Sequence, residues 1–218
     1  MSFEAILLWS LALGAAMGGV LLVVALRGAQ PSAIARSTEL GQFAAALEAA
    51  EREPPRRRDD LLAAAIAAKH RLDWERALSW LETAHREDLA DGEVLVELGL
   101  VDVYRGRTDT ADAWLRQASA ARSDLAESIT LHRAFAALVG GDRDQAARLF
   151  EEVEAPLVTK LTVDVGAGEP AFAEWFLHAA ALWRDAGEHE RADWAQRQAV
   201  ESAPESLLPE HVRSVLAP

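Results

Sequence analysis

The sequence predicts an all-α protein in which a single N-terminal transmembrane helix precedes a solenoid of helical hairpins. Three observations lead to this fold class. Residues 5–26 are apolar and carry no charge, the 100 residues between Pro55 and Pro156 contain no proline, and four segments of the body align with one another. A proline-free stretch of this length favours helices, because proline is the main helix breaker.

The uncharged segment 5–26 is long enough to cross a membrane. At 1.5 Å per residue a helix of this length spans about 33 Å, and the hydrocarbon core of a bilayer is about 30 Å thick. A cleaved signal peptide would have a basic amino end, whereas the tail before this segment contains Glu4 and neither Lys nor Arg. We therefore expect residues 1–30 to form a transmembrane anchor.

The flanking charges predict which way the anchor points. Arg27 and Arg36 follow the span, and no Lys or Arg precedes it. Because positive flanks stay in the cytoplasm, we expect a single-pass protein of the cell (inner) membrane with a cytoplasmic body, with an extracytoplasmic body as the alternative. Gly14 and Gly18 are spaced so that two spans can pack closely as a homodimer, although glycine is common in membrane helices anyway.

The composition excludes several classes of function. Residues 59–218 carry 30 acidic and 16 basic side chains, and the whole chain has a net charge of −13. Nucleic acid is therefore not expected as a partner, because phosphate binding needs clustered positive charge. The chain has no Cys, which excludes disulfides and a thiol nucleophile.

Four segments of the body, 72–84, 106–118, 141–153 and 187–199, share one pattern. Each has Ala at its sixth position and a small or branched residue seven positions later. The pairs are Ala77 with Ala84, Ala111 with Ala118, Ala146 with Val153, and Ala192 with Ala199. Leu81, Leu115, Phe150 and Gln196 stand between them. Small residues two turns apart on one helix face let a neighbouring helix approach, and a large residue between them fills the gap.

The segments also begin alike. Three open with Gly106, Gly141 or Gly187, and the first opens with Leu72. A glycine there ends one helix in the left-handed conformation, and the polar residues after it are candidate caps of the next helix. The candidate caps are Asp73, Asp109 and Asp142.

The aligned Ala residues are 34, 35 and 46 positions apart, and a period of 34 with this pattern resembles the tetratricopeptide repeat (TPR). The second unit carries the fullest match, although Asp102 stands where an aromatic residue is usual. Its matching residues are Leu95, Leu98, Gly99, Gly106, Ala111, Leu115 and Ala118. The resemblance covers residues 58–204 and implies about four repeats.

The remaining segments follow from this division. We expect a juxtamembrane neck helix within 31–57, centred on 41–53, and a capping helix within 205–218, because stacked repeats need a cover for the last apolar face. The longer third spacing places an insert at 155–170. Its apolar residues alternate with polar ones from Leu157 to Val165, which is a strand-like pattern.

No catalytic, cofactor-binding or metal site is apparent in the sequence. No two of the six His residues have the spacing of three or four that two metal ligands on one helix need, and most of them are expected to be solvated. The motifs of phosphate-binding loops, dinucleotide-binding folds and serine hydrolases are missing. We therefore expect a protein that is not an enzyme and has no cofactor.

In TPR proteins the first helix of each unit lines a concave groove that binds a peptide or a partner helix, so the resemblance implies protein partners. Segment 93–104 is apolar nearly all round and must be buried by something. Family geometry places seven apolar residues in the groove: Val96, Leu100, Val103, Tyr104, Leu131, Phe135 and Leu138. Either a hydrophobic partner segment covers them, or the protein's own superhelix, its neck helix or the 155–170 insert fills the groove.

The sequence thus predicts a non-enzymatic, membrane-anchored scaffold or adaptor that mediates protein–protein interaction or complex assembly. One alternative is a chaperone-like accessory factor for secretion or for biogenesis of cytochrome c or another membrane complex. Another is a structural subunit of a larger membrane complex.

Overall fold

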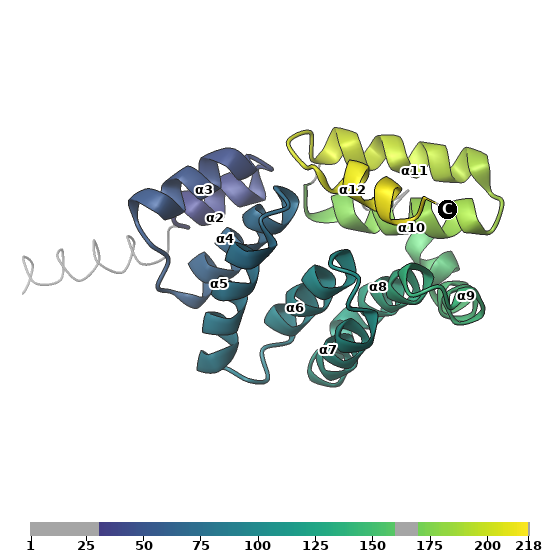
Figure 1. Cartoon of the computed structure of the whole chain (residues 1–218), viewed down its shortest axis with the longest axis horizontal. Coiled ribbons are helices and arrows are strands. Elements are labelled where there is room, and N and C mark those ends of the chain that lie inside the picture. The colour runs from purple at the N-terminus through teal and green to yellow at the C-terminus, as the bar shows by residue number, and fades with distance from the viewer. Residues whose placement is uncertain (1–30, 160–169, 218) are drawn as a thin grey trace, which may run out of the picture. The chain divides into compact units, whose positions relative to one another are not determined.

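Helical hairpins follow one another along the residues that this computed structural model describes, 31–159 and 170–217 (Figure 1). The hairpins are α2 (Ala33–Glu39) with α3 (Phe43–Arg52), α4 (Arg58–His70) with α5 (Trp74–Glu87), α6 (Gly92–Tyr104) with α7 (Thr108–Ala121), α8 (Ala126–Val139) with α9 (Arg143–Thr159), and α10 (Ala173–Asp185) with α11 (His189–Ser202). A short helix, α12 (Leu208–Val215), ends the body, and the 3-10 turns η1 (Ser123–Leu125) and η3 (Pro170–Phe172) precede α8 and α10. The all-α prediction is confirmed over these two ranges, which contain no strand.

The predicted membrane span, residues 5–26 with Gly14 and Gly18, lies outside the described residues. Within 31–159 and 170–217, no helix combines the length and the apolar character that crossing a membrane requires.

The predicted turns are present in all four units. Gly106, Gly141 and Gly187 have φ of 74°, 82° and 83°, which L side chains rarely adopt. Leu72 has φ 63° at the corresponding position, at a cost of about 1–2 kcal/mol for a residue with a Cβ. Its side chain packs against a hydrophobic cluster that includes Leu131, Phe135 and Phe176, here called the main core. This contact offsets part of that cost.

The predicted caps are confirmed in two cases of three. The backbone N–H of Arg76 donates to Asp73 Oδ1 over 3.3 Å, and that of Gln145 donates to Asp142 Oδ1 over 2.9 Å. The prediction for Asp109 is wrong, because α7 already begins at Thr108 and Asp109 lies inside the helix.

The repeated small residues pack as the pattern predicts. All four Ala residues at the sixth position are at most 1% exposed. Helices α6 and α7 approach so closely that a Cβ added to Gly99 would lie 2.8 Å from Leu115 Cγ, which is shorter than real Cβ contacts. The positions that align in the sequence are therefore the positions at which neighbouring helices contact each other.

Two neighbouring alanines of α9 test this register. Ala146 is buried and Ala147 is exposed. We expect Ala146→Leu to lower the free energy of unfolding by about 1–3 kcal/mol, because it overpacks the contact with α8, and Ala147→Leu to change it by less than about 0.5 kcal/mol. Thermal melts of the two variants check this, and equal melting temperatures would contradict the register.

Two predicted segments differ in the structure. Residues 31–57 contain the hairpin α2–α3 where we expected one neck helix, because the chain turns at Gly41 with φ 69°. Helix α9 continues through Pro156 to Thr159, so the start of the predicted strand-like insert is helical. Leu157, only 2% exposed, packs into the main core from this last turn of the helix. Residues 160–169 of the insert lie outside the described residues.

The segment that follows α11 is hydrogen-bonded to α3 and to the end of α4. The backbone N–H of Leu207 donates to the carbonyl of His70 over 2.9 Å, and Arg71 Nη1 donates to the carbonyl of Glu205 over 2.9 Å. Glu205 Oε2 in turn accepts from the backbone N–H of Ala44 over 3.1 Å. Helix α10 also packs along α8, and α12 contacts α6, so these two C-terminal helices cover the inner side of α6 and α8.

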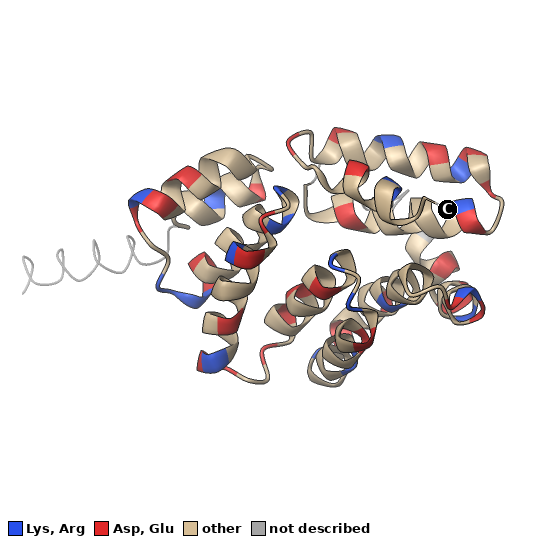
Figure 2. Cartoon of the chain, viewed as in Figure 1, with Lys and Arg blue, Asp and Glu red and all other residues tan. Residues whose placement is uncertain are grey.

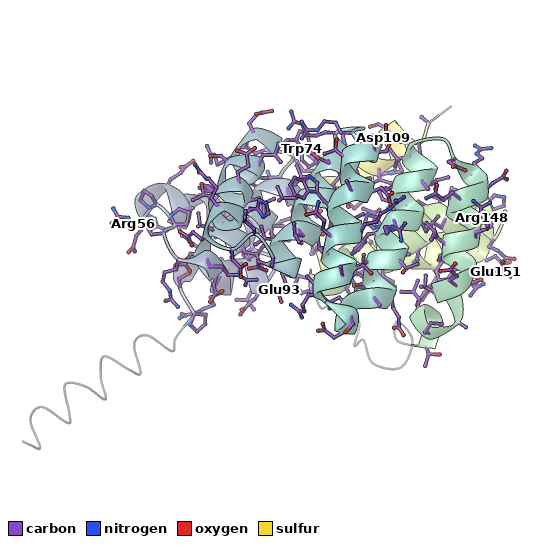
Figure 3. All side chains as sticks on the ribbon, turned by 90° about the horizontal axis from the view of Figure 1, so that it is seen from below. Arg56, Trp74, Glu93, Asp109, Arg148 and Glu151 are labelled. Carbon is purple, nitrogen blue, oxygen red and sulfur yellow. The ribbon has the colours of Figure 1, made fainter. Side chains whose placement is uncertain are left out.

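Charged side chains of both signs are spread over the helices of the body (Figure 2). Arg148 and Glu151 of α9, for example, point away from the body at its edge (Figure 3). Three charged residues, Lys69, Glu97 and Glu174, instead pair with one another inside the body, between α4, α6 and α10.

Candidate functional site: a cavity beside a buried ionic network

The residues predicted to line a groove are part of the core. Leu100, Val103, Tyr104, Leu131, Phe135 and Leu138 are at most 7% exposed, and Val96 is half-buried. They form one cluster with Phe176 and Leu177 of α10, and Phe135 stacks on the ring of His178 at 3.9 Å between centroids. The protein's own α10 and α12 therefore fill the groove at this strip, as the alternative of a self-filled groove has it. A partner cannot reach these side chains while the two helices stay in place.

One buried ammonium and two carboxylates join helices α4, α6 and α10. Lys69 of α4 is fully buried, and its Nζ donates to Glu97 Oε2 of α6 over 2.6 Å and to Glu174 Oε2 of α10. Burial alone favours the neutral forms, yet the two carboxylates raise the pKa of Lys69, and Lys69 holds the pKa of Glu174 below its usual range. Lys69 and Glu174 are therefore charged inside the body.

A chain of hydrogen bonds extends from Glu174 into the core. The hydroxyl of Tyr104 donates to Glu174 Oε1 over 2.7 Å and lies 2.8 Å from His178 Nε2. Because a carboxylate only accepts, Tyr104 has used its proton there and accepts from His178 Nε2–H. His178 Nδ1 is then the acceptor for the Nδ1–H of His132, 2.9 Å away. This assignment leaves both imidazoles neutral.

Burial keeps three His residues neutral. It lowers the pKa of His70 to about 3 and that of His132 to about 4, and it lowers the pKa of His178 well below its usual value. The prediction that most His residues are solvated is wrong for these three. His132 of α8 and His178 of α10 face each other between the two helices, and the segment after α11 covers His70. His189 is exposed, and His85 and His211 are half-buried.

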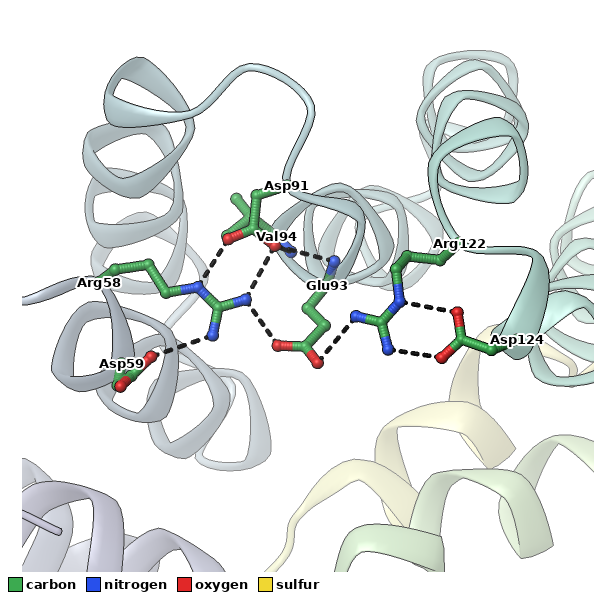
Figure 4. Close-up of polar contacts among 7 residues, drawn as sticks. All are labelled: Arg58, Asp59, Asp91, Glu93, Val94, Arg122 and Asp124. Atoms are coloured by element: carbon green, nitrogen blue, oxygen red, sulfur yellow. Dashed lines mark hydrogen bonds and ion pairs between the residues drawn. The ribbon is translucent and has the colours of Figure 1, made fainter. Parts of the chain in front are cut away.

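A second ionic cluster fixes the start of α4 against α6 (Figure 4). Arg58 donates to both oxygens of Asp91, over 2.6 and 2.8 Å, and to Glu93 over 2.6 Å. Asp91 also caps α6 by accepting from the backbone N–H groups of Glu93 and Val94. The hydrogen bonds from Arg58 hold the pKa of Asp91 below its usual value, so the guanidinium is engaged by its own neighbours.

A cavity of about 550 Å³ separates these two ionic clusters. Its apolar wall includes Leu62 and Ile66, one turn apart on α4 and both half-buried. Glu97 and Glu174 line its buried end, while Glu39 and Asp59 are exposed. The complete lining is Ala35, Thr38, Glu39, Phe43, Arg58, Asp59, Leu62, Ala63, Ile66, His70, Glu97, Pro170, Ala171 and Glu174. Its volume is in the range of sites that take a side chain or a small molecule.

The sequence analysis missed the polar residues of this site. A signal was available, since Glu97 interrupts the apolar segment 93–104 and Lys69 ends a run of apolar residues in α4. A charged residue within an apolar helix is expected to be paired when buried. The partner of Lys69, Glu174, lies 105 positions away, and no local pattern connects the two.

Among the described residues, no group of three or more His, Asp or Glu side chains is arranged to hold a metal ion. The lining of the cavity offers carboxylate oxygens and apolar surface for binding.

No family model matches the chain, and no curated protein matches it. Among solved structures, the chain is similar to MamA labelled MSR-1, with 18% identity, 78% of this chain and 92% of that chain covered, and a TM-score of 0.49. MamA labelled AMB-1 gives 19% identity, 77% and 93% coverage, and a TM-score of 0.48. YrrB, described as a TPR protein with an unusual peptide-binding site, gives 18% identity, 88% and 87% coverage, and a TM-score of 0.40. The hairpins and the packing of their repeated small residues make the described body a solenoid of helical hairpins.

Proposed function

We propose that this chain is a membrane-anchored, non-enzymatic scaffold whose TPR-like body holds a segment of another protein. The observation that carries the proposal is the cavity beside α4, where Leu62 and Ile66 remain half-buried on the inner face of the first repeat. The same face of α6 and α8 is covered by α10 and α12. A partner segment in the cavity would remove apolar surface from water at about 25 cal/mol per Å².

The membrane anchor is part of the same proposal. The uncharged residues 5–26 and the Arg residues after them support a span with the body in the cytoplasm. Anchoring restricts the body to the membrane surface, where a scaffold meets membrane-bound partners at raised effective concentration.

Site-specific photo-crosslinking in intact cells tests the proposal. A photo-reactive amino acid is placed at Ile66 in the cavity or, as a control, at Val200, which is 46% exposed on α11. After crosslinking, the membranes are isolated and washed at high pH, and the chain should remain in them. We expect an adduct with another protein at position 66 and none at position 200. The adduct is identified by mass spectrometry and must be lost when Leu62→Glu changes the same wall.

Other results contradict parts of this proposal. Release of the chain from washed membranes would exclude the anchor, and a reporter after Pro218 that is active only outside the cytoplasm would reverse the orientation. Absence of any adduct at position 66 would exclude the cavity as the contact surface. A stoichiometric partner would favour a complex subunit, and many transient ones a chaperone-like factor.

A further inference from the structure

We propose that the cavity recognises a cationic side chain, Lys or Arg, that the partner presents among apolar residues. That the ligand is a polypeptide rests on the proposed function. That it presents a cation rests on the residues that line the cavity. Charge, an unused acceptor and the apolar wall each support it.

Carboxyl groups outnumber cations around the cavity. Four lining residues carry a carboxyl group, Glu39, Asp59, Glu97 and Glu174, and one, Arg58, carries a guanidinium. Counting the ammonium of Lys69, which lies against Glu97 and Glu174, still leaves two carboxyl groups in excess. An incoming cation is therefore favoured over an incoming anion.

The two cations already present are occupied. Arg58 donates to Asp59, Asp91 and Glu93, and Lys69 donates to Glu97 and Glu174. A carboxylate or phosphate ligand would have to displace these bonds inside a partly desolvated site. His70 offers no positive charge, because burial lowers its pKa to about 3.

Glu97 supplies the acceptor for the new cation. Its Oε2 accepts from Lys69, while Oε1 accepts no hydrogen bond from any residue in the described ranges. By contrast, Glu174 uses both oxygens, one for Lys69 and one for Tyr104. Desolvation raises the pKa of Glu97, and a cation on Oε1 relieves this penalty on its charged form.

The apolar wall fits the rest of such a side chain. Lys and Arg bury their aliphatic stems against apolar surface while the charged end reaches a polar partner. Leu62 and Ile66 provide this surface between the exposed rim at Asp59 and the buried Glu97. An apolar neighbour of the cation in the partner would cover the remaining apolar lining.

Peptide binding to the full chain tests the inference. The chain is held in nanodiscs of zwitterionic phosphatidylcholine, so that the membrane adds no net charge. Three peptides, Gly-Leu-X-Leu-Gly-amide with X as Lys, norleucine or Glu, each carrying fluorescein on the amino terminus, are titrated by fluorescence anisotropy. We expect the Lys peptide to bind at least about tenfold more tightly than the norleucine peptide, and the Glu peptide not to bind.

Matched variants locate the binding. Glu97→Gln keeps an acceptor for Lys69 and removes the charge, and we expect it to weaken the Lys peptide about tenfold or more while leaving the norleucine peptide unchanged. Glu152→Gln on the exposed side of α9 makes the same change away from the cavity and should alter neither peptide. If Glu97→Gln lowers the melting temperature, Glu39→Gln at the exposed rim decides instead, with a loss of about twofold to threefold for the Lys peptide alone.

The outcomes separate this inference from the proposed function. Equal affinity for the Lys and norleucine peptides, or no binding of either, overturns the cation preference even where position 66 gives an adduct in cells. Lys-selective binding that depends on Glu97, without any adduct at position 66, supports the chemistry and contradicts the proposed function. An adduct at position 66 with a second copy of this chain overturns the inference of a separate partner.

Discussion

Replacing Lys69 by Met is expected to lower the free energy of unfolding by about 3–5 kcal/mol, because it leaves Glu174 as a buried charge without its cation. The ammonium is fully buried and bonds to carboxylates of two other helices. Met matches the length of the Lys stem, so the packing changes little and the loss is mainly electrostatic. Chemical denaturation with a two-state fit measures the effect.

Two further variants show that the loss comes from an uncompensated charge. Lys69→Met combined with Glu174→Gln removes the ammonium and one of its two carboxylates. It should recover a large part of the stability, because neutral replacement of a buried pair is often tolerated and Glu97, whose pKa is raised by burial, can bind a proton. Arg213→Met breaks an exposed pair with Glu210 and should cost less than about 0.5 kcal/mol. Equal losses from Lys69→Met and Arg213→Met would mean that the ion pair is open to water.

Lowering the pH from 7.5 to 5.0 is expected to destabilise the body by several kcal/mol. The pKa values of His70, His132 and His178 are depressed in the folded state, two of them to about 3 and about 4. Below about pH 6.5 the unfolded chain therefore binds more protons than the folded one, and stability falls with pH. At pH 5.0 His70 and His132 each contribute a loss of about 2 kcal/mol, from 1.36 kcal/mol per pH unit, and His178 adds a loss in the same direction.

Other groups modify this dependence in known directions. The raised pKa of Glu97 makes the folded state bind protons first, so it opposes the loss between pH 4.5 and its own pKa. The depressed pKa of Glu174 adds a further loss only below about pH 4.5. Denaturation at pH 7.5, 6.5, 5.5 and 5.0 gives the profile.

One substitution assigns part of the pH dependence to the hydrogen-bonded chain. His132→Gln keeps a donor for His178 and removes a titrating group, so the loss of stability between pH 6.5 and 5.0 should be smaller than in the unmodified chain. His189→Gln on the surface should leave the profile unchanged. A flat profile in the unmodified protein would contradict the neutral, buried assignment of these His residues.

The sequence predicts the local part of this structure well and the long-range part poorly. Turns such as Gly141 and close contacts such as Ala146 depend on neighbours within one or two units, and the repeat pattern reveals them. The packing of α10 against α4 and α8 depends on pairs such as Lys69 with Glu174, which no periodicity connects. For the same reason the apolar residues from Val96 to Leu138 were compatible with either an open or a filled groove.

The bond from Leu207 to His70 also changes how this body is expected to fold. Linear repeat arrays behave as one-dimensional systems, in which each unit is stabilised only by its neighbours and folding spreads from any starting point. Here the last unit and the first contact each other, so the end units are not free to fray independently. The contacts that close the array have a high sequence separation, which raises the relative contact order and slows folding. We therefore expect the body to unfold as one cooperative unit, and a truncation at either terminus to weaken the opposite end of the chain.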